Sequence, residues 1–163
     1  MADRSGGTGA VPDEGGGAAE GIVERIWLKR VRRGPMDAVE EAELVADRGI
    51  VGNANQGGRR QVTLISRGAW SAVEAELGEE VDPASRRANL LVAGIALAES
   101  RGRVLRVGPC RLRIEGETKP CRLMDEEHPG LQEALGPEWR GGVFAAVLDG
   151  GRVRRGDSVA WVD

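Results

Sequence analysis

The sequence is poor in the residues that most often form disulfides and metal sites. Its 163 residues include only 2 Cys and 1 His. Two cysteines provide no disulfide framework, and with a single histidine they match no common zinc arrangement. A chain of this length can bury a sufficient core without disulfides or a structural metal. We therefore expect one domain in a reducing, cytoplasmic environment.

Long apolar runs and a net positive charge are also missing. No apolar run approaches the roughly 20 residues that cross a bilayer. The 23 basic and 26 acidic residues give a net charge of −3, so we expect neither membrane nor nucleic acid as a partner. Residues 1–20 are rich in Gly, Ala and acidic side chains and carry no apolar segment typical of a signal peptide. They predict a flexible tail before a domain over residues 21–163.

Lysine is almost absent from the basic residues. Lys29 and Lys119 are the only two lysines, so 21 of the 23 basic residues are arginines. An arginine guanidinium binds phosphate or carboxylate through two parallel hydrogen bonds, although arginine richness also follows from a GC-biased genome.

Short apolar runs separated by glycine turns predict a mainly β fold. In GIVERIWL, the side chains of Ile22, Ile26 and Leu28 would share one face of a strand. The run AVEEAELVA (38–46) alternates like a strand, but its Ala and Glu residues also suit a helix. Further strands are expected in QVTLIS, NLLVAGI, RVLRVG, CRLRIEGE and in two apolar runs within VFAAVLDGGRVRRGDSVAWV.

Helices are expected in only two places. In RGAWSAVEAELG, three apolar residues, Trp70, Val73 and Leu77, recur on one helical face, with Ser66 as the N-cap and Gly78 closing the helix. GLQEALG predicts one or two further turns. The pattern indicates a mostly antiparallel β-barrel with one or two peripheral α-helices, without a repeat or a second domain.

Two arginine pairs are candidate anion sites. GGRRQVT brings Arg59 and Arg60 into a strand after a glycine turn, and SRRANLLV places a second pair, ending in Arg87, two residues before Asn89. Glycine lets a backbone approach a ligand closely, and arginine binds anions. Neither segment has the spacing of a nucleotide phosphate-binding loop. Each pair alone is more typical of a solvated turn, but two pairs in one small domain favour an anionic small-molecule ligand.

The two thiols lie in different surroundings. Cys121, in GETKPCRLMD, is flanked by Lys119 and Arg122, and nearby cations favour a thiolate, the form that acts as nucleophile or soft-metal ligand. Cys110 begins an apolar strand, so we expect it to serve as a small buried hydrophobic residue. His128 follows Cys121 by seven residues, yet it precedes a Pro-Gly turn and no third orienting group is evident. A cysteine–histidine hydrolase is therefore disfavoured.

The succession of motifs from residue 21 to about residue 162 resembles the MOSC family, named after the C-terminal domain of molybdenum cofactor sulfurase. The resemblance is carried by Arg-x-Asn-Leu at 87–90, by Pro120-Cys121, and by a closing Gly-Gly…Gly-Asp hairpin, within the segments GIVERIWLKR, RGPMDAVEEAELVADRGIVGN, RRQVTLI, RRANLLVAGI, RVGPCRLRIEGETKPCRLMD, GLQEAL and RGGVFAAVLDGGRVRRGDSV.

This resemblance implies a β-barrel that binds molybdenum cofactor, or carries sulfur, on one cysteine. Cys121 would either ligate molybdenum directly or form a persulfide, and Arg87 and Asn89 would face the cofactor or substrate. We expect Arg87, Asn89 and the two cations beside the thiol, Lys119 and Arg122, to act with Cys121 in catalysis. The implied cofactor-binding residues are Arg59, Arg60, Gln61, Thr63, Arg87, Asn89 and Asn53. Family members often carry Gly-Asp where this chain has Gly52-Asn53.

Three functions stay open at this point. The first is a molybdenum-cofactor oxidoreductase acting on N-hydroxylated or similar small molecules. The second is a metal-free sulfur-transfer or carbon–sulfur bond-cleaving enzyme, and the third is a non-catalytic carrier of cofactor or sulfur. The sequence shows no pyridoxal phosphate-dependent desulfurase region and no electron-delivering region. We therefore expect no pyridoxal phosphate, and an external reductase or sulfur donor protein as partner.

Overall fold

The computed structural model describes residues 20–162, so the tail predicted over residues 1–20 lies, apart from Glu20, outside the described residues. The strands are β1 (Glu20–Lys29), β2 (Met36–Val39), β3 (Glu41–Val45), β4 (Gly49–Ile50), β5 (Val62–Ser66), β6 (Leu90–Ala93), β7 (Val104–Val107), β8 (Cys110–Glu117), β9 (Val143–Asp149), β10 (Gly151–Arg154) and β11 (Ser158–Trp161). The helices are α1 (Arg67–Leu77), α2 (Leu123–Glu127) and α3 (Leu131–Leu135), with 3₁₀ turns η1 (Pro83–Arg86) and η2 (Pro137–Trp139).

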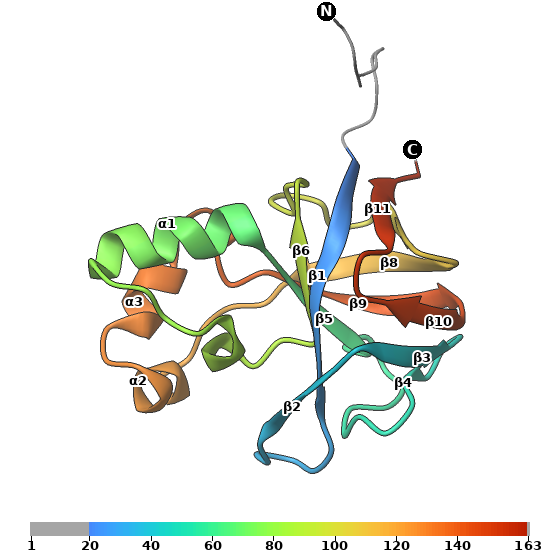
Figure 1. Cartoon of the computed structure of the whole chain (residues 1–163), viewed down its shortest axis with the longest axis horizontal. Helices are drawn as coiled ribbons and strands as arrows, with labels where there is room; N and C mark the ends of the chain where they lie inside the picture. Colours follow the sequence, from blue (N-terminus) through green and yellow to red (C-terminus); the bar gives the residue numbers. More distant parts are fainter. Residues whose placement is uncertain (1–19, 163) are drawn as a thin grey trace, which may run out of the picture.

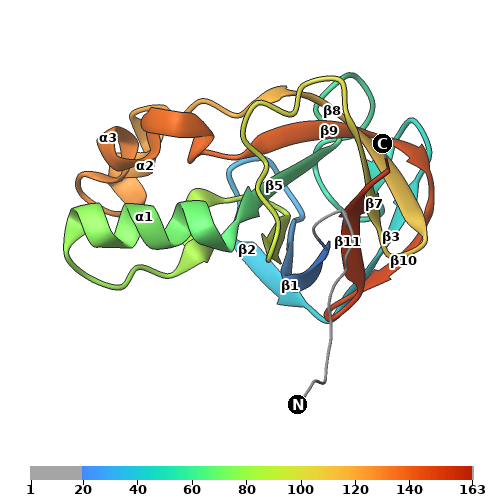
Figure 2. The same cartoon turned by 90° about the horizontal axis from the view of Figure 1, so that it is seen from above.

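Seven strands close into a barrel, as predicted. They follow the order β11-β7-β8-β9-β5-β6-β1, and the pairing of β11 with β1 completes the circle (Figure 2). All neighbours are antiparallel except β5 and β6, which run parallel because α1 and η1 connect them. Strand β2 extends the sheet beyond β1, and β10, β3 and β4 form a separate three-stranded sheet.

The three α-helices lie together on one side of the barrel (Figure 1). This arrangement creates two apolar cores, because successive side chains of a strand point to opposite faces. In β5, Val62 and Leu64 belong to the barrel core, whereas Ile65 packs under the helices. In β1, Trp27 likewise points away from the barrel and packs with Trp70 of α1.

Helix α1 has the ends that the sequence predicts. The hydroxyl of Ser66 accepts a hydrogen bond from the backbone N–H of Ala69 at 3.2 Å. Gly78 closes the helix in the left-handed conformation, with a φ of 77°. The indole of Trp70, buried beneath this helix, donates to Val81 O at 2.8 Å.

The predicted face of β1 is wrong at its beginning. Ile22 is 48% exposed, while Val23, Ile26 and Leu28 fill the barrel. The register between β1 and β6 shifts between Val23 and Arg25, and this irregularity reverses the alternation of inward and outward side chains. Sequence alternation alone assumes a regular strand and cannot locate such a shift.

Three other expectations need adjustment. The run 38–46 is extended rather than helical, but it is divided between β2 and β3, which belong to different sheets. The closing strands do not form the expected hairpin, because β10 pairs with β3 while β11 pairs with β7 and β1. The described chain also has three α-helices rather than one or two, since the sequence LMDEE forms α2.

Candidate functional site

A cleft of about 430 Å³ lies between the barrel and α2. Its volume is within the range typical of small-molecule sites. Side chains reach it from the end of β1, from β5, from the turn before β6, and from the segment that contains α2. The lining residues are Lys29, Arg32, Arg33, Asn53, Asn55, Arg60, Gln61, Thr63, Arg86, Arg87, Ala88, Asn89, Thr118, Lys119, Cys121, Leu123, Met124, Glu126, Glu127 and Gly141.

The cleft is strongly cationic. Seven of its lining side chains are basic and only two, Glu126 and Glu127, are acidic. The concentration of positive charge affects Lys29. Burial, together with repulsion from the neighbouring arginines Arg87, Arg60 and Arg32, lowers its pKa from the ordinary 10.5. Like charges gathered without enough counter-charges favour the binding of an anion.

Cys121 lies exposed on this cationic surface, as the sequence predicts. It precedes α2, and its carbonyl accepts a hydrogen bond from Met124 N at 2.9 Å in the first turn. Its backbone is therefore held by the helix while its sulfur can reach a ligand. An exposed thiol among cations can act as a nucleophile or as a soft-metal ligand.

Cys110 has the opposite environment. Its side chain is 0% exposed and packs in the barrel core with Leu112 and Ile114. Burial, followed by the nearby carboxylates of Asp157 and Asp149, raises the pKa of this thiol to about 11. The structure therefore shows the predicted difference in exposure between the two cysteines.

Arg86 forms the inner wall of the cleft and was not among the predicted site residues. Only 7% of its surface is exposed. Its Nε donates to Gly141 O at 2.8 Å, and Nη2 donates to Thr118 O at 3.3 Å. Nη1 lies 3.3 Å from the sulfur of Met124. The sequence highlights Arg87 of this pair, and nothing in the local pattern shows that its neighbour is the buried one.

Arg87, which is half-buried, also lines the cleft. It ends η1 in the left-handed conformation, with a φ of 65°, which is unusual for a side chain with a Cβ. Its Nη2 donates to Gly34 O at 2.5 Å and so connects η1 to the loop between β1 and β2. That loop contributes Arg32 and Arg33 to the same cleft.

Asn89 also lines the cleft, but its amide is fully used within the protein. Its Oδ1 accepts hydrogen bonds from the N and Oγ1 of Thr63, at 3.1 and 3.2 Å. Its Nδ2 donates to Trp27 O at 3.1 Å and to Asn53 Oδ1 at 3.2 Å. Asn53 Oδ1 accepts a further bond from Lys29 N at 2.9 Å. These contacts make Asn89, Thr63 and Asn53 a rigid floor that fixes β1, β5 and β6 beneath the cleft.

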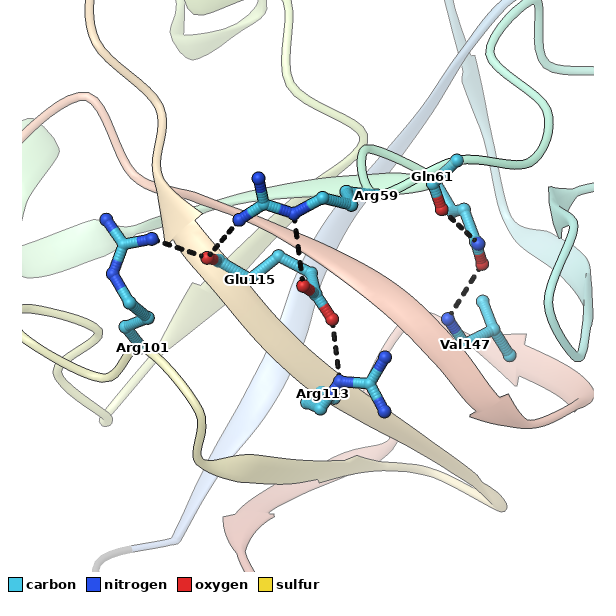
Figure 3. A network of polar contacts seen from close by, with 7 residues as sticks. Arg59, Gln61, Arg101, Arg113, Glu115 and Val147 are labelled. Carbon is cyan, nitrogen blue, oxygen red and sulfur yellow. Dashed lines mark hydrogen bonds and ion pairs between the residues drawn. The ribbon is translucent and has the colours of Figure 1, made fainter.

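Arg59, predicted to bind cofactor, does not line the cleft. It lies over Glu115 on β8, donating from Nε to Oε1 at 3.4 Å and from Nη2 to the carbonyl at 3.2 Å (Figure 3). Gln61 does line the cleft, yet its amide donates to Gly58 O at 2.7 Å and accepts from Val147 N at 2.9 Å. Gln61 therefore supports the turn that presents Arg60.

The remaining predicted residues are spread over the surface. Lys119 lines the cleft, and its Nζ pairs with Glu117 Oε1 at 3.3 Å in a solvent-exposed contact. Arg122 is exposed and is not part of the lining. His128 is not part of the lining either, and its Nε2 lies 3.0 Å from Oε2 of Glu79, which follows α1.

Other cleft residues escaped the sequence analysis for different reasons. Thr118 is buried at the cleft wall, and its Oγ1 has no hydrogen-bond partner among the described residues. Gly141 passes so close to this segment that a Cβ on it would lie 2.3 Å from Thr118 O. The sequence could not show that Gly141 approaches the segment after β8, because the two are distant along the chain.

Residues 20–162 contain neither a cluster of metal-ligating side chains nor a membrane-spanning helix. No group of three or more His, Cys, Asp and Glu side chains in this part of the chain could hold a metal ion. None of the helices in the described chain is long and apolar enough to cross a membrane.

Solved structures with the same architecture come from several bacteria. The YuaD protein of Bacillus subtilis matches with a TM-score of 0.74 at 19% identity, over 86% of this chain and 94% of that chain. YiiM of Escherichia coli matches with a TM-score of 0.68 at 18% identity, over 88% and 70%. YiiM of Geobacillus stearothermophilus gives 0.66 at 14%, over 90% and 74%. At these identities the likeness shows a shared fold.

Family membership comes from the sequence pattern itself. Among proteins with curated descriptions, none matches the chain significantly. The sequence model of the MOSC domain matches residues 49–160, which is more than half of the chain and includes most of the cleft residues. The barrel, the matched segment and the exposed Cys121 agree with the resemblance seen in the motifs. This chain therefore belongs to the MOSC domain family.

Proposed function

We propose that the cleft binds an anionic pterin cofactor carrying molybdenum, with Cys121 as the protein's metal ligand. The observation that carries this proposal is the exposed thiol of Cys121 in a cleft with seven basic and two acidic side chains. MOSC domains are generally linked to molybdenum cofactor, and this chain belongs to that family.

The lining residues fit such a cofactor chemically. A molybdopterin carries a phosphate and a hydrogen-bonding pterin ring, so it needs cations and polar partners. Lys29, Arg60 and Arg87 supply charge for the phosphate. The hydroxyl of Thr118 and the amide of Asn55 lie at the cleft, and neither side chain has a hydrogen-bond partner within the described residues.

Cys121 is the sole cysteine of this lining, and no cluster of protein ligands accompanies it among residues 20–162. A metal held there would therefore take its other ligands from the cofactor, while the thiolate provides a soft donor. When bound, the cofactor would supply transfer of an oxygen atom and an electron pair, which suits reduction of N-hydroxylated small molecules.

Such a reduction requires a source of electrons. Two electrons and two protons convert an N–OH group into N–H and release water. We infer that an external reductase supplies the electrons, with a small molecule entering over the exposed edge of the cleft. The basic side chains of the cleft would bind and orient an anionic substrate or cofactor and balance its charge.

A metal-free function is the second candidate. The exposed thiol of Cys121 among basic side chains could equally hold a persulfide, whose terminal sulfur carries negative charge at neutral pH. A donor protein that carries a persulfide would load it: the Cys121 thiolate attacks the donor's outer sulfur, and the donor cysteine leaves as a thiolate. A nucleophilic acceptor molecule would then take that sulfur and release the Cys121 thiolate, so neither step needs an oxidant. This alternative uses the same cysteine but requires no pterin.

Reconstitution separates the two candidates. The chain is produced in a host that cannot make molybdenum cofactor, mixed with cofactor released from another molybdoenzyme, and separated by gel filtration. Our proposal expects pterin fluorescence and molybdenum to elute with the wild-type chain and to be lost in Cys121→Ser and Arg60→Ala. Absence of pterin from the wild-type fraction, with one extra sulfur atom on Cys121 in the mass spectrum after incubation with a sulfur donor, would support the metal-free candidate instead.

A further inference from the structure

The outer face of β8 and its neighbours carries a group of exposed arginines. Arg111, Arg113 and Glu115 alternate with buried residues along β8, so their side chains share the outer face of the barrel. Arg106 of β7 lies opposite Arg111 in the strand register, and Arg101 Nη1 donates to Glu115 O at 2.9 Å. We call the four exposed arginines Arg101, Arg106, Arg111 and Arg113 the arginine face.

Two carboxylates accompany the arginine face, and they do not balance its charge. Glu115 accepts from Arg113 Nε at 2.6 Å and from Arg59 Nε at 3.4 Å (Figure 3). Only 14% of the Glu115 side chain is exposed, against 49% for Arg113. Asp149 pairs with Arg111. The surface presented to solvent is therefore positive, although the whole chain has a net charge of −3.

The arginine face keeps hydrogen-bond donors available for a ligand. A guanidinium has five N–H donors. Within residues 20–162, Arg113 uses one of them on the Glu115 carboxylate and Arg101 uses one on the Glu115 carbonyl, while Arg106 has no hydrogen bond or ion pair. Arginines that are already held in place lose less conformational freedom on binding. The face is therefore suited to bind several carboxylates at once.

The arginine face is continuous with the edge of the cleft. Arg59, which bonds to Glu115, stacks on the ring of Phe144 together with Arg60, and Arg60 lines the cleft. A protein bound across β8 would consequently lie beside the cleft.

Acidic side chains gather on another side of the molecule. Helix α2 contains Asp125, Glu126 and Glu127, and Glu79 and Glu80 follow α1. The helices lie on the opposite side of the barrel from β7 and β10 (Figure 2). A protein with an acidic surface would be attracted to the arginine face and repelled by the helices, so this separation of charge would orient its approach.

We propose that the arginine face is the docking surface for an acidic protein, the donor that supplies electrons or sulfur to the cleft. The inference rests on the proposed function, because both candidate functions need a donor protein. The donor presents carboxylates to Arg101, Arg106 and Arg113, and its own donor group then lies beside the cleft.

The test measures binding of a fluorescein-labelled octaglutamate peptide to the cofactor-free full chain by fluorescence anisotropy. We expect binding at low ionic strength that weakens as salt is added. Arg106→Gln, and the double variant of Arg101→Gln with Arg113→Gln, should each weaken binding on the order of tenfold, as expected for a lost charge-assisted hydrogen bond. Arg106→Gln removes no hydrogen bond or ion pair within residues 20–162, so it keeps the test valid if the double variant fails to fold.

Arg152→Gln is the matched control for the arginine face. Arg152 lies on β10, is 46% exposed and pairs with Glu41, much as Arg113 pairs with Glu115. This variant should leave the peptide affinity unchanged, and Arg87→Ala, which alters the cleft, should have a smaller effect than Arg106→Gln. Absence of peptide binding, equal weakening in Arg152→Gln and Arg106→Gln, or weakening in Arg87→Ala alone would each overturn the proposal.

A labelled single-stranded oligothymidine is the second probe. Tighter binding of this oligonucleotide than of the peptide, with loss in Arg106→Gln, would overturn the proposal in favour of a nucleic acid partner. Peptide binding requires no cofactor. The expected peptide results without pterin binding would therefore reject the molybdenum function alone and leave the docking surface to a sulfur donor.

Discussion

Arg59 and Arg60 stack on the same ring, that of Phe144, but only Arg60 lines the cleft. Their guanidinium carbons lie 5.7 and 5.2 Å from the ring centroid, and Arg59 turns to Glu115 on β8. The pair therefore provides a matched comparison. Arg60→Ala should weaken the binding of an anion such as sulfate by about 1.5–3 kcal/mol, the usual worth of a charge-assisted hydrogen bond, and Arg59→Ala should leave it unchanged. Isothermal titration measures both.

Arg87→Ala should weaken anion binding by a similar amount without loss of the fold, since its side chain reaches Gly34 O at the surface loop rather than the core. Unchanged sulfate affinity in both Arg60→Ala and Arg87→Ala would show that these arginines belong to solvated turns.

Lys29 makes anion binding depend on pH. Its pKa lies below 10.5 because of burial and the neighbouring arginines. The charged form of Lys29 therefore lowers the free energy of unfolding. This destabilisation is fully present below the lowered pKa and is lost as the pH rises through it. A bound anion stabilises the charged form of Lys29, so anion binding should be accompanied by proton uptake at this side chain.

Sulfate keeps the same charge throughout the alkaline range, so its affinity should fall as the pH rises through the lowered pKa and Lys29 loses its proton. The variant Lys29→Met should bind more weakly and with less dependence on pH. Parallel slopes for the wild type and Lys29→Met would show that Lys29 does not contact the anion.

The two cysteines should differ in reactivity and in their effect on stability. Native alkylation near neutral pH should label Cys121 and spare Cys110, whose pKa is about 11 and whose side chain is buried. Cys110→Ser should lower the free energy of unfolding by about 1–3 kcal/mol, because it buries a hydroxyl in the barrel core. Cys121→Ser should change it little. Peptide mass spectrometry and thermal melts report the outcome, and preferential labelling of Cys110 would contradict it.

Replacement of Asn89 should affect the stability of the fold more than ligand binding. Asn89→Ala removes contacts to Thr63, Trp27 and Asn53 and leaves buried polar groups unpaired, at a cost of about 1–3 kcal/mol each. Asn55→Ala is the control, since Asn55 lines the same cleft without a hydrogen bond of its side chain within the described residues. A melting temperature for Asn89→Ala equal to that of Asn55→Ala would argue against a structural role.

Local patterns predicted the parts of the fold that depend on neighbours in sequence. Ser66 and Gly78 delimit α1 because capping is a local interaction. Short runs of β-forming residues separated by glycine turns were sufficient to predict a barrel. The face predicted for Ile22 was wrong, because the irregularity in β1 depends on its pairing with β6, which is distant in sequence.

Among the cleft residues, the sequence singled out those that stand in an unusual local pattern. Cys121 could be found because a thiol between two cations is a local feature, and Arg60 because it follows a glycine turn. Arg86 and Lys29 could not, since their roles depend on burial and on contacts that only folding creates. Asn89 was predicted to face a ligand; it lines the cleft, and its amide is bonded to β5, to β1 and to the loop that carries Asn53, contacts that only folding creates.

The central claim is that Cys121 holds molybdenum in this cleft, and the molybdenum content of purified protein tests it most directly. Wild type, Cys121→Ser and Cys110→Ser are produced in a host that makes the cofactor, and metal per folded chain is measured by mass spectrometry. We predict molybdenum in the wild type and in folded Cys110→Ser, and its loss from Cys121→Ser. Equal molybdenum in Cys121→Ser and wild type, or none in any of the three, would contradict the claim.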